Sequence, residues 1–364
     1  MYVRERTALI SFCLVPLVVF VGNIIHQGHR ASLYLAGVCI IGAFIRNLWV
    51  RAFVWYWVAW VLLMMIMSAL GNFPSLDLQK AVIATGYLAF TMMFYLAMQE
   101  SGMKIDRIFN VICFAAMLQA LLCVCQMWNF DPHFKLMELY ASVKKTLPET
   151  EVTGTLGNNN FLAVYLAIST PFFFRRYWAY FVPVLLSIIL ISLTSTAVAG
   201  LMIGSVVFFK DRIKWKWIIL AAIPFIVYLF IIKASLTWNF TWDHDRFHWW
   251  KSALVFWHTN WASMMFGFGP SVSWGQKFPI HNEWLTALFN FGLIGFGIAL
   301  GYFLTAYRKN RHLYAAFITA AVTLNGTYPL HLAPSGMLCV IIMGLMEREK
   351  LNASSGIIYD KRIV

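Results

Sequence analysis

Residues 108–128 read IFNVICFAAMLQALLCVCQMW and contain no Asp, Glu, Lys or Arg. A helix that crosses a bilayer needs about 20 mostly apolar residues, so this stretch predicts a membrane span. Working outward in both directions, we find further apolar segments near 8–26, 31–47, 52–70, 78–98, 159–174, 177–193, 195–209, 216–234, 284–306, 312–328 and 332–346. The sequence therefore predicts an all-α, polytopic transmembrane helical bundle of about 12 spans, with residues 1–364 forming a single integral-membrane domain.

The composition supports this class. The chain is 61% hydrophobic and only 12% charged, whereas a soluble domain carries about 25% charged residues to cover its surface. Soluble enzymes, nucleic-acid-binding domains and secreted disulfide scaffolds are therefore excluded. The lipid bilayer is the expected surrounding of most of the folded surface.

The basic residues predict the orientation of the spans. With the N-terminus inside, about two thirds of the 28 Lys and Arg residues fall in short inner segments, as the positive-inside rule requires. Both termini are then expected to be cytoplasmic. The net charge of +13 is explained by this asymmetry, so we expect no nucleic-acid partner.

Polar residues concentrate in two outer loops, a first loop at 129–158 and a much longer one at 235–283. Loops longer than about 15 residues in a compact protein are usually functional or disordered. These loops are rich in Trp and Phe, which disfavours disorder. We therefore expect the long loop to be partly helical and to carry an active site at the outer membrane surface.

The first candidate element joins the first outer loop to the next span and contains Gly157, Asn158 and Asn160. One interpretation is a capped helix start, because an Asn side chain accepts a bond from the first N–H groups of a helix. The other is an anion site, because the positive end of a helix attracts a phosphate.

The second candidate lies in the long loop, where Arg246 and Lys251 stand among tryptophans. One interpretation is an interfacial helix anchored by Trp249 and Trp250. The alternative is a diphosphate clamp, since Arg binds phosphate with a fork of donors and Lys adds a mobile charge. His244 and His248 have a spacing that can hold a metal, but no second ligand cluster accompanies them and we expect no metal.

Further candidates lie at the outer ends of spans. His281, Asn282 and Glu283 directly precede the apolar stretch 284–306, and a histidine can exchange a proton near neutral pH. His331 lies between two prolines in the last outer turn and could line the same cavity or simply satisfy a loop carbonyl. Lys80 begins a span on the outer face and is a possible phosphate contact, or a snorkelling side chain.

The order of these elements resembles the O-antigen ligase and polymerase superfamily. Gly157-Asn158-Asn159-Asn160 resembles its GNxN element, and His281-Asn282-Glu283-Trp284-Leu285 followed by Gly292-Leu293-Ile294-Gly295 resembles its HNxxL and GLIG segments. Tyr328-Pro329-Leu330-His331 resembles the family's late outer turn. The likeness covers roughly residues 150–345. It departs from the family at Leu193-Thr194-Ser195-Thr196-Ala197, where members commonly carry an Arg.

The resemblance implies a glycosyltransferase of the bacterial inner membrane that acts on the periplasmic side. Such a protein moves a glycan from an undecaprenyl-diphosphate carrier to an acceptor hydroxyl, without a metal or another cofactor. His281 would be the general base, and Arg246 would hold the leaving diphosphate. Substrate binding would fall to Asn282, Glu283, Lys251, His331, Gly157, Asn158, Asn160 and Lys80.

The sequence does not determine which molecule accepts the glycan. Lipid A-core, as for a ligase, is preferred over a growing polysaccharide or a protein hydroxyl, as for a polymerase or a protein O-oligosaccharyltransferase. A lipid or polysaccharide transporter or flippase is the alternative from another class, and a non-catalytic membrane scaffold is a third. Few ionisable residues lie inside the spans, which disfavours a transporter.

Overall fold

The computed structural model describes residues 103–128, 154, 156, 159–175, 177–192, 194–212, 241–259, 261–268, 282–325 and 333–354. Every regular element in these ranges is a helix, so the all-α class is confirmed for this part of the chain. The elements are α5 (Ile105–Met127), α7 (Asn159–Ser169), η2 (Thr170–Phe173), η3 (Ala179–Phe181), α8 (Val182–Ile191), α9 (Ser195–Phe209), α11 (Thr241–Trp257), α12 (Trp261–Phe266), α14 (Glu283–Leu304), α15 (Arg311–Thr323) and α16 (Ala333–Ser354).

The number of spans is not established by these helices. Within the described residues, α5 alone combines the length and the apolar composition that a membrane crossing requires, and a buried core helix can meet the same criteria. The segments expected near 8–26, 31–47, 52–70, 78–98 and 216–234 lie outside the described residues. Of the first outer loop, 129–158, only residues 154 and 156 are described, and of the second, 235–283, residues 235–240, 260 and 269–281 lie outside the description.

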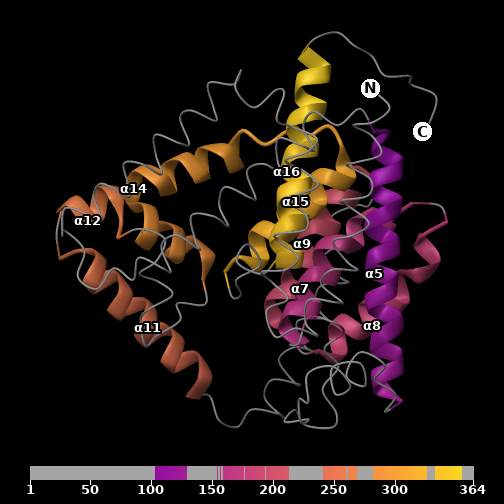
Figure 1. Cartoon of the computed structure of the whole chain (residues 1–364), viewed down its shortest axis with the longest axis horizontal. Helices are drawn as coiled ribbons and strands as arrows, with labels where there is room; N and C mark the ends of the chain where they lie inside the picture. Colours follow the sequence, from indigo (N-terminus) through magenta and orange to yellow (C-terminus); the bar gives the residue numbers. More distant parts are fainter. Residues whose placement is uncertain are drawn as a thin grey trace, which may run out of the picture.

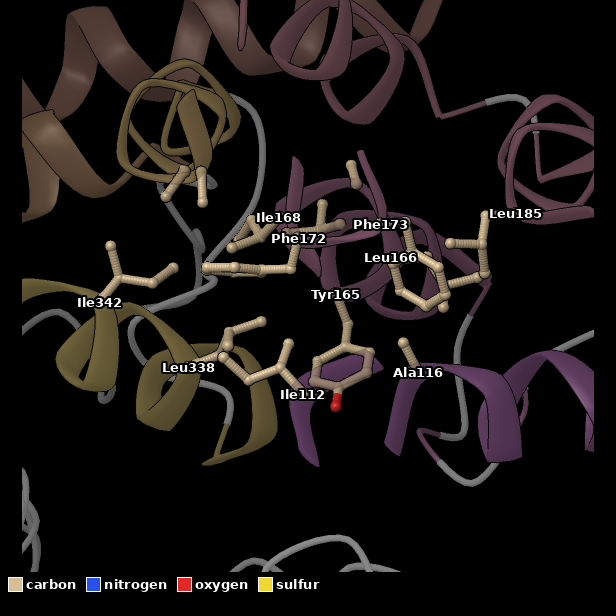
Figure 2. Packing of buried hydrophobic residues seen from close by; sticks show 14 of the residues in the cluster. Ile112, Ala116, Tyr165, Leu166, Ile168, Phe172, Phe173, Leu185, Leu338 and Ile342 are labelled. Carbon is tan, nitrogen blue, oxygen red and sulfur yellow. The ribbon is translucent and has the colours of Figure 1, made fainter. Parts of the chain in front are cut away.

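The core of the bundle surrounds α7 and η2. Leu162, Leu166 and Ile168 are fully buried, and Phe172 and Phe173 continue the same apolar surface. Figure 2 shows Leu166, Ile168, Phe172 and Phe173 between side chains of three other helices: Ile112 of α5, Leu185 of α8, and Leu338 and Ile342 of α16. A helix that is apolar on all sides is stable only when other elements cover it. The sequence of α7 therefore fixes it as the central helix of this group.

Helices α9 and α15 lie against each other through small residues. Gly200 and Gly204 of α9 are four residues apart and therefore share one face. A methyl group added at Gly200 would lie 2.8 Å from the Thr319 carbonyl oxygen, and one added at Gly204 would lie 2.8 Å from that of Ala315. This is the close backbone approach that a Gly-x-x-x-Gly pattern permits between two packed helices.

One end of the bundle gathers residues for which the sequence predicts the inner side of the membrane. Side-chain contacts join neighbouring segments here, and His312 Nδ1 lies 2.8 Å from the Pro171 carbonyl oxygen. The contacts of charged residues are Arg348 Nη1 to the Met103 carbonyl oxygen at 3.0 Å, Arg175 Nη2 to Asp106 Oδ1 at 2.7 Å, and Arg311 Nη2 to Asp211 Oδ2 at 2.9 Å. Each pair belongs to segments assigned to the same predicted side.

The opposite end joins residues for which the sequence predicts the outer side. The Gln126 side chain clamps Gly154, because its Nε2 donates to the Gly154 carbonyl at 3.1 Å and its Oε1 accepts from the Gly154 N–H at 2.9 Å. Thr194 donates to Asn160 Oδ1 at 2.7 Å, and the Glu283 N–H donates to the Leu324 carbonyl at 2.8 Å. At each end of the bundle, residues that share a predicted side therefore meet each other.

Gln126→Leu should destabilise the fold by about 1–3 kcal/mol, because it removes both hydrogen bonds between the Gln126 side chain and the Gly154 backbone in a buried place. We expect the midpoint of thermal unfolding in detergent to fall. Leu121→Ala on the exposed face of the same helix, where the side chain is 60% exposed, should leave the midpoint nearly unchanged. Equal midpoints for Gln126→Leu and Leu121→Ala would contradict the clamp.

The segment at 284–306 differs from the uninterrupted span expected there. Gly292 has φ 63° and ψ −169°, which breaks α14 into two halves. The ring centroids of Trp284 and Phe303 lie 4.7 Å apart, whereas a straight helix would place residues 19 positions apart at about 28 Å. The second half of α14 therefore folds back toward the first. The expectation of one straight crossing here is wrong, because glycine admits a backbone conformation that ends the helix.

Candidate functional site

Helices α11, α12 and α14 form a group beside the bundle (Figure 1). An aromatic cluster holds this group together, in which the Phe268 ring lies 4.9 Å from that of Phe256 and 4.8 Å from that of Phe289. The Phe268 N–H also donates to the Phe289 carbonyl at 2.9 Å. A carbonyl that precedes a helix break needs such an outside donor.

The break in α14 also allows the end of α12 to pack directly against the backbone at Gly292. A side chain at Gly292 would collide with the backbone at Met265 and Phe266, the last residues of α12. The left-handed φ and this collision both require glycine at position 292. The position of α12 against α14 thus depends on the first glycine of the Gly292-Leu293-Ile294-Gly295 segment.

A cleft of about 770 Å³ lies between α11, the start of α14 and the end of α15. On α11 it is lined by residues with helical spacing i, i+3, i+4 and i+7, which therefore share one face. The lining residues are Lys251, Leu254, Val255 and His258 on this face, the neighbouring Trp250, and Asn282, Trp284, Leu285 and Asn325 opposite. The walls are mainly apolar, with a few polar groups.

The start of α14 is held firmly at this cleft. Asn282 is the N-cap, and its Oδ1 accepts from the Leu285 N–H at 3.1 Å. The Trp284 indole donates to the Ala321 carbonyl at 3.3 Å. Glu283 is only 4% exposed and does not line the cleft. A capped helix start anchored to α15 therefore forms one wall of the cleft.

The structure brings together two of the residues predicted to bind substrate. Lys251 comes from the long outer loop and Asn282 from the boundary of the following span, yet both line this cleft. Glu283 is adjacent in the chain but buried. Asn160 does not line the cleft, since its Oδ1 accepts from Thr194 at the start of α9.

Thr194 lies in the segment where the resembling family commonly carries an arginine. In this chain its hydroxyl group ties the start of α9 to Asn160 and so to the start of α7. Position 194 therefore has a structural role in joining two helix starts. The Asn160 contact also favours the interpretation of Asn159 and Asn160 as part of a helix start, where the Asn160 N–H donates to Asn159 Oδ1 at 2.8 Å.

Several predicted site residues lie outside the described residues: Lys80, Gly157, Asn158, His281 and His331. Arg246 lies on α11 by its backbone, and its side chain is outside the description, as are those of Asp243, His244 and Asp245. Among the described side chains, no group of His, Cys, Asp and Glu is arranged to hold a metal ion. The roles assigned to all these residues stay predictions.

Sequence reasoning missed His258, Trp284 and Asn325 as residues of the cleft. The sequence spacing could have indicated His258. It follows Lys251 by seven residues, which is about two helical turns, so both side chains lie on the same face of the helix. No comparable signal pointed to Asn325, which reaches the cleft only through the packing of α15 against α14.

Comparison with protein-family models, with curated proteins and with solved structures finds no match for this chain.

Proposed function

We propose that this protein is a membrane glycosyltransferase that moves a glycan from an undecaprenyl-diphosphate carrier to an acceptor hydroxyl on the periplasmic side of the bacterial inner membrane. An O-antigen ligase-like reaction with lipid A-core as the acceptor is preferred. The observation that carries the proposal is the shared cleft of Lys251 and Asn282, because it joins a cation to the residue that directly follows His281.

The charge at the cleft supports a phosphate-bearing donor. Lys251 supplies a cation, and no acidic side chain is present among the described residues that line the cleft. A lysine binds phosphate as a mobile point charge. Trp250 and Trp284 supply the aromatic surface that is favoured at the level of lipid headgroups. A donor whose diphosphate lies at that level fits this mixture of charge and apolar wall.

The contacts at the two ends of the bundle support the membrane arrangement. Segments assigned to the inner side by their basic residues meet each other, as Arg175 and Asp106 do. Segments assigned to the outer side also meet, as Thr194 and Asn160 do. The cleft lies with the outer group, since Asn325 at the end of α15 lines it.

The proposed reaction is a displacement at the sugar carbon that carries the diphosphate. His281 takes the proton of the acceptor hydroxyl, whose oxygen forms the new glycosidic bond. The bond from the sugar carbon to the diphosphate oxygen breaks, and the diphosphate leaves with the electron pair. Arg246 and Lys251 stabilise the negative charge that develops on it, which is the kind of interaction that lowers a barrier most. The proton on His281 then passes to solvent.

Lys251→Ala should lower kcat/KM for the lipid-linked donor about tenfold, a loss near 1.4 kcal/mol. The reason is that the exposed lysine contributes charge without a rigid geometry. The measurement is transfer of a labelled glycan from its polyprenyl-diphosphate carrier in membranes that contain the protein. Lys251→Arg should recover most of the activity.

Ser252→Ala is the matched control, because Ser252 is the next residue of α11, is exposed, and does not line the cleft. It should transfer glycan at the rate of the unchanged protein. Equal rates for Lys251→Ala and Ser252→Ala would remove Lys251 from the site and with it the observation on which the proposal rests.

A further inference from the structure

Basic side chains from two segments meet at the predicted inner end of the bundle. One segment is the turn that follows α9, and the other is the loop that leads into α15. An ion pair joins them, since Arg311 Nη2 lies 2.9 Å from Asp211 Oδ2. We call these basic residues the inner cation cluster, and its members are Lys210, Arg212, Arg308, Lys309 and Arg311. Each lies within three residues of Asp211 or Arg311, so its backbone is within about 11 Å of one of them.

The cluster carries an excess of positive charge. All five of its side chains are exposed, and within the two segments they are opposed by one carboxylate, that of Asp211. Glu349 of α16 approaches the loop near Tyr307, but its Oε1 lies 4.0 Å from Nη2 of Arg348. The cations of the cluster therefore exceed the acidic groups available to balance them.

The apolar residues beside the cluster favour a lipid over a soluble anion. Residues 195–209, which form α9, contain no charged side chain, and Lys210 follows them directly. Ile203 is 45% exposed and precedes Lys210 by seven residues, so both side chains lie on one helix face. In the proposed membrane arrangement this face contacts acyl chains, and the cations lie at the level of the inner headgroups.

We infer that the inner cation cluster binds the headgroup of an anionic phospholipid of the inner leaflet, with an acyl chain along the Ile203 face of α9. A headgroup with two phosphates, as in cardiolipin, matches a cluster that takes its cations from two segments. The inference rests on the membrane orientation of the proposed function but not on glycan transfer. It concerns the end of the bundle opposite to the cleft.

The experiment measures equilibrium binding of lipids to the purified full chain in detergent by native mass spectrometry. The probes are cardiolipin, phosphatidylglycerol and phosphatidylcholine. We expect cardiolipin to bind at least about tenfold more tightly than phosphatidylcholine, with phosphatidylglycerol between them, because each added phosphate meets further cations. Equal binding of cardiolipin and phosphatidylcholine would overturn the inference. Displacement of cardiolipin by an equal concentration of inorganic phosphate would also overturn it, since the cluster would then bind a soluble anion.

A double variant tests the cluster itself. Lys210→Gln combined with Lys309→Gln removes one cation from each segment and leaves the pair of Arg311 and Asp211 in place. Neither lysine forms an ion pair with a described carboxylate, so the thermal unfolding midpoint should stay unchanged. A basic residue near anionic lipid contributes about fivefold in affinity, and the double variant should therefore bind cardiolipin at least about tenfold more weakly. If it fails to fold, Lys309→Gln alone should weaken binding about fivefold.

The matched control removes the same number of charges from the same end of the bundle. Lys104→Gln combined with Arg107→Gln changes two exposed residues at the start of α5. Phe109 faces His312, with ring centroids 5.8 Å apart, and Arg107 lies on the opposite face of α5 because two positions of a helix turn it by about 200°. The control should keep the affinity for cardiolipin within about twofold. Equal losses in the two double variants would assign the binding to overall charge and overturn the inference.

The outcomes separate this inference from the proposed function. Cluster-dependent cardiolipin binding by a protein that transfers no glycan would support the inference and defeat the proposed function. Glycan transfer by a protein that binds cardiolipin no better than phosphatidylcholine would overturn the inference and leave the proposed function standing.

Discussion

His281→Ala should abolish glycan transfer while leaving expression and the thermal unfolding midpoint unchanged. A positioned general base contributes about 10²–10⁴-fold to a rate, and alanine cannot take the proton of the acceptor hydroxyl. His281→Gln should be equally inactive, because an amide keeps the polarity of the position but is not a base. The measurement is transfer of a labelled glycan in membranes with matched protein levels.

Retained transfer in both His281 variants would reject the assignment of the base. Loss of transfer together with a lowered unfolding midpoint would instead assign His281 a structural role. The cap that follows it is independent of the imidazole, because Asn282 Oδ1 accepts from the Leu285 N–H. The fold of α14 should therefore survive the His281 changes.

Gly292→Ala should have the largest effect on the structure of the site. A non-glycine residue with this positive φ and extended ψ costs about 1–3 kcal/mol, and the collision of the new methyl group with the α12 backbone at Met265 adds about 1–3 kcal/mol. We expect α12 and α11 to shift from α14, the cleft to lose its shape, and transfer to fall with the thermal unfolding midpoint.

Gly297→Ala is the matched control on the same helix. A methyl group there meets nothing within 4 Å, and alanine favours a helix over glycine by about 0.5–1 kcal/mol. This variant should be as stable as the unchanged protein or slightly more so, with full transfer. Similar losses in Gly292→Ala and Gly297→Ala would contradict the role given to the break.

The helices of the bundle could be predicted well from the apolar segments. Residues 195–209 were expected as one segment, and α9 covers those same residues. The segment expected at 159–174 forms α7 and η2, and the segment expected at 312–328 forms α15. The observed ends differ from the expected ones by a few residues. Local composition was sufficient because each helix is defined by its own apolar run.

The break in α14 could not be predicted from the same signal. Glycine is frequent within apolar helices and is often tolerated there, so Gly292 and Gly297 are alike in the sequence. What distinguishes them is the α12 backbone packed against Gly292 and open space around Gly297. That difference exists only once the chain has folded back on itself.

The sequence predicted which kinds of residue would form the site, but only some of the residues that line the cleft. Lys251 and Asn282 were singled out for separate reasons, one as a cation and one as the neighbour of a histidine. Their common cleft depends on the contact between α11 and α14, which local sequence does not encode. Trp284 belongs to the segment His281-Asn282-Glu283-Trp284-Leu285, but that motif gave it no role in a cleft. Asn325 belongs to no motif and lines the cleft only because the end of α15 lies beside the start of α14.

The most direct test of the account is transfer by the purified chain in liposomes that hold a defined polyprenyl-diphosphate glycan and lipid A-core, with a chelator present. We predict a product in which the glycan is joined to the acceptor, release of the carrier diphosphate, and no product with His281→Ala. Absence of product from the well-folded protein with lipid A-core, polysaccharide and protein acceptors alike, or equal product from His281→Ala, would contradict the account.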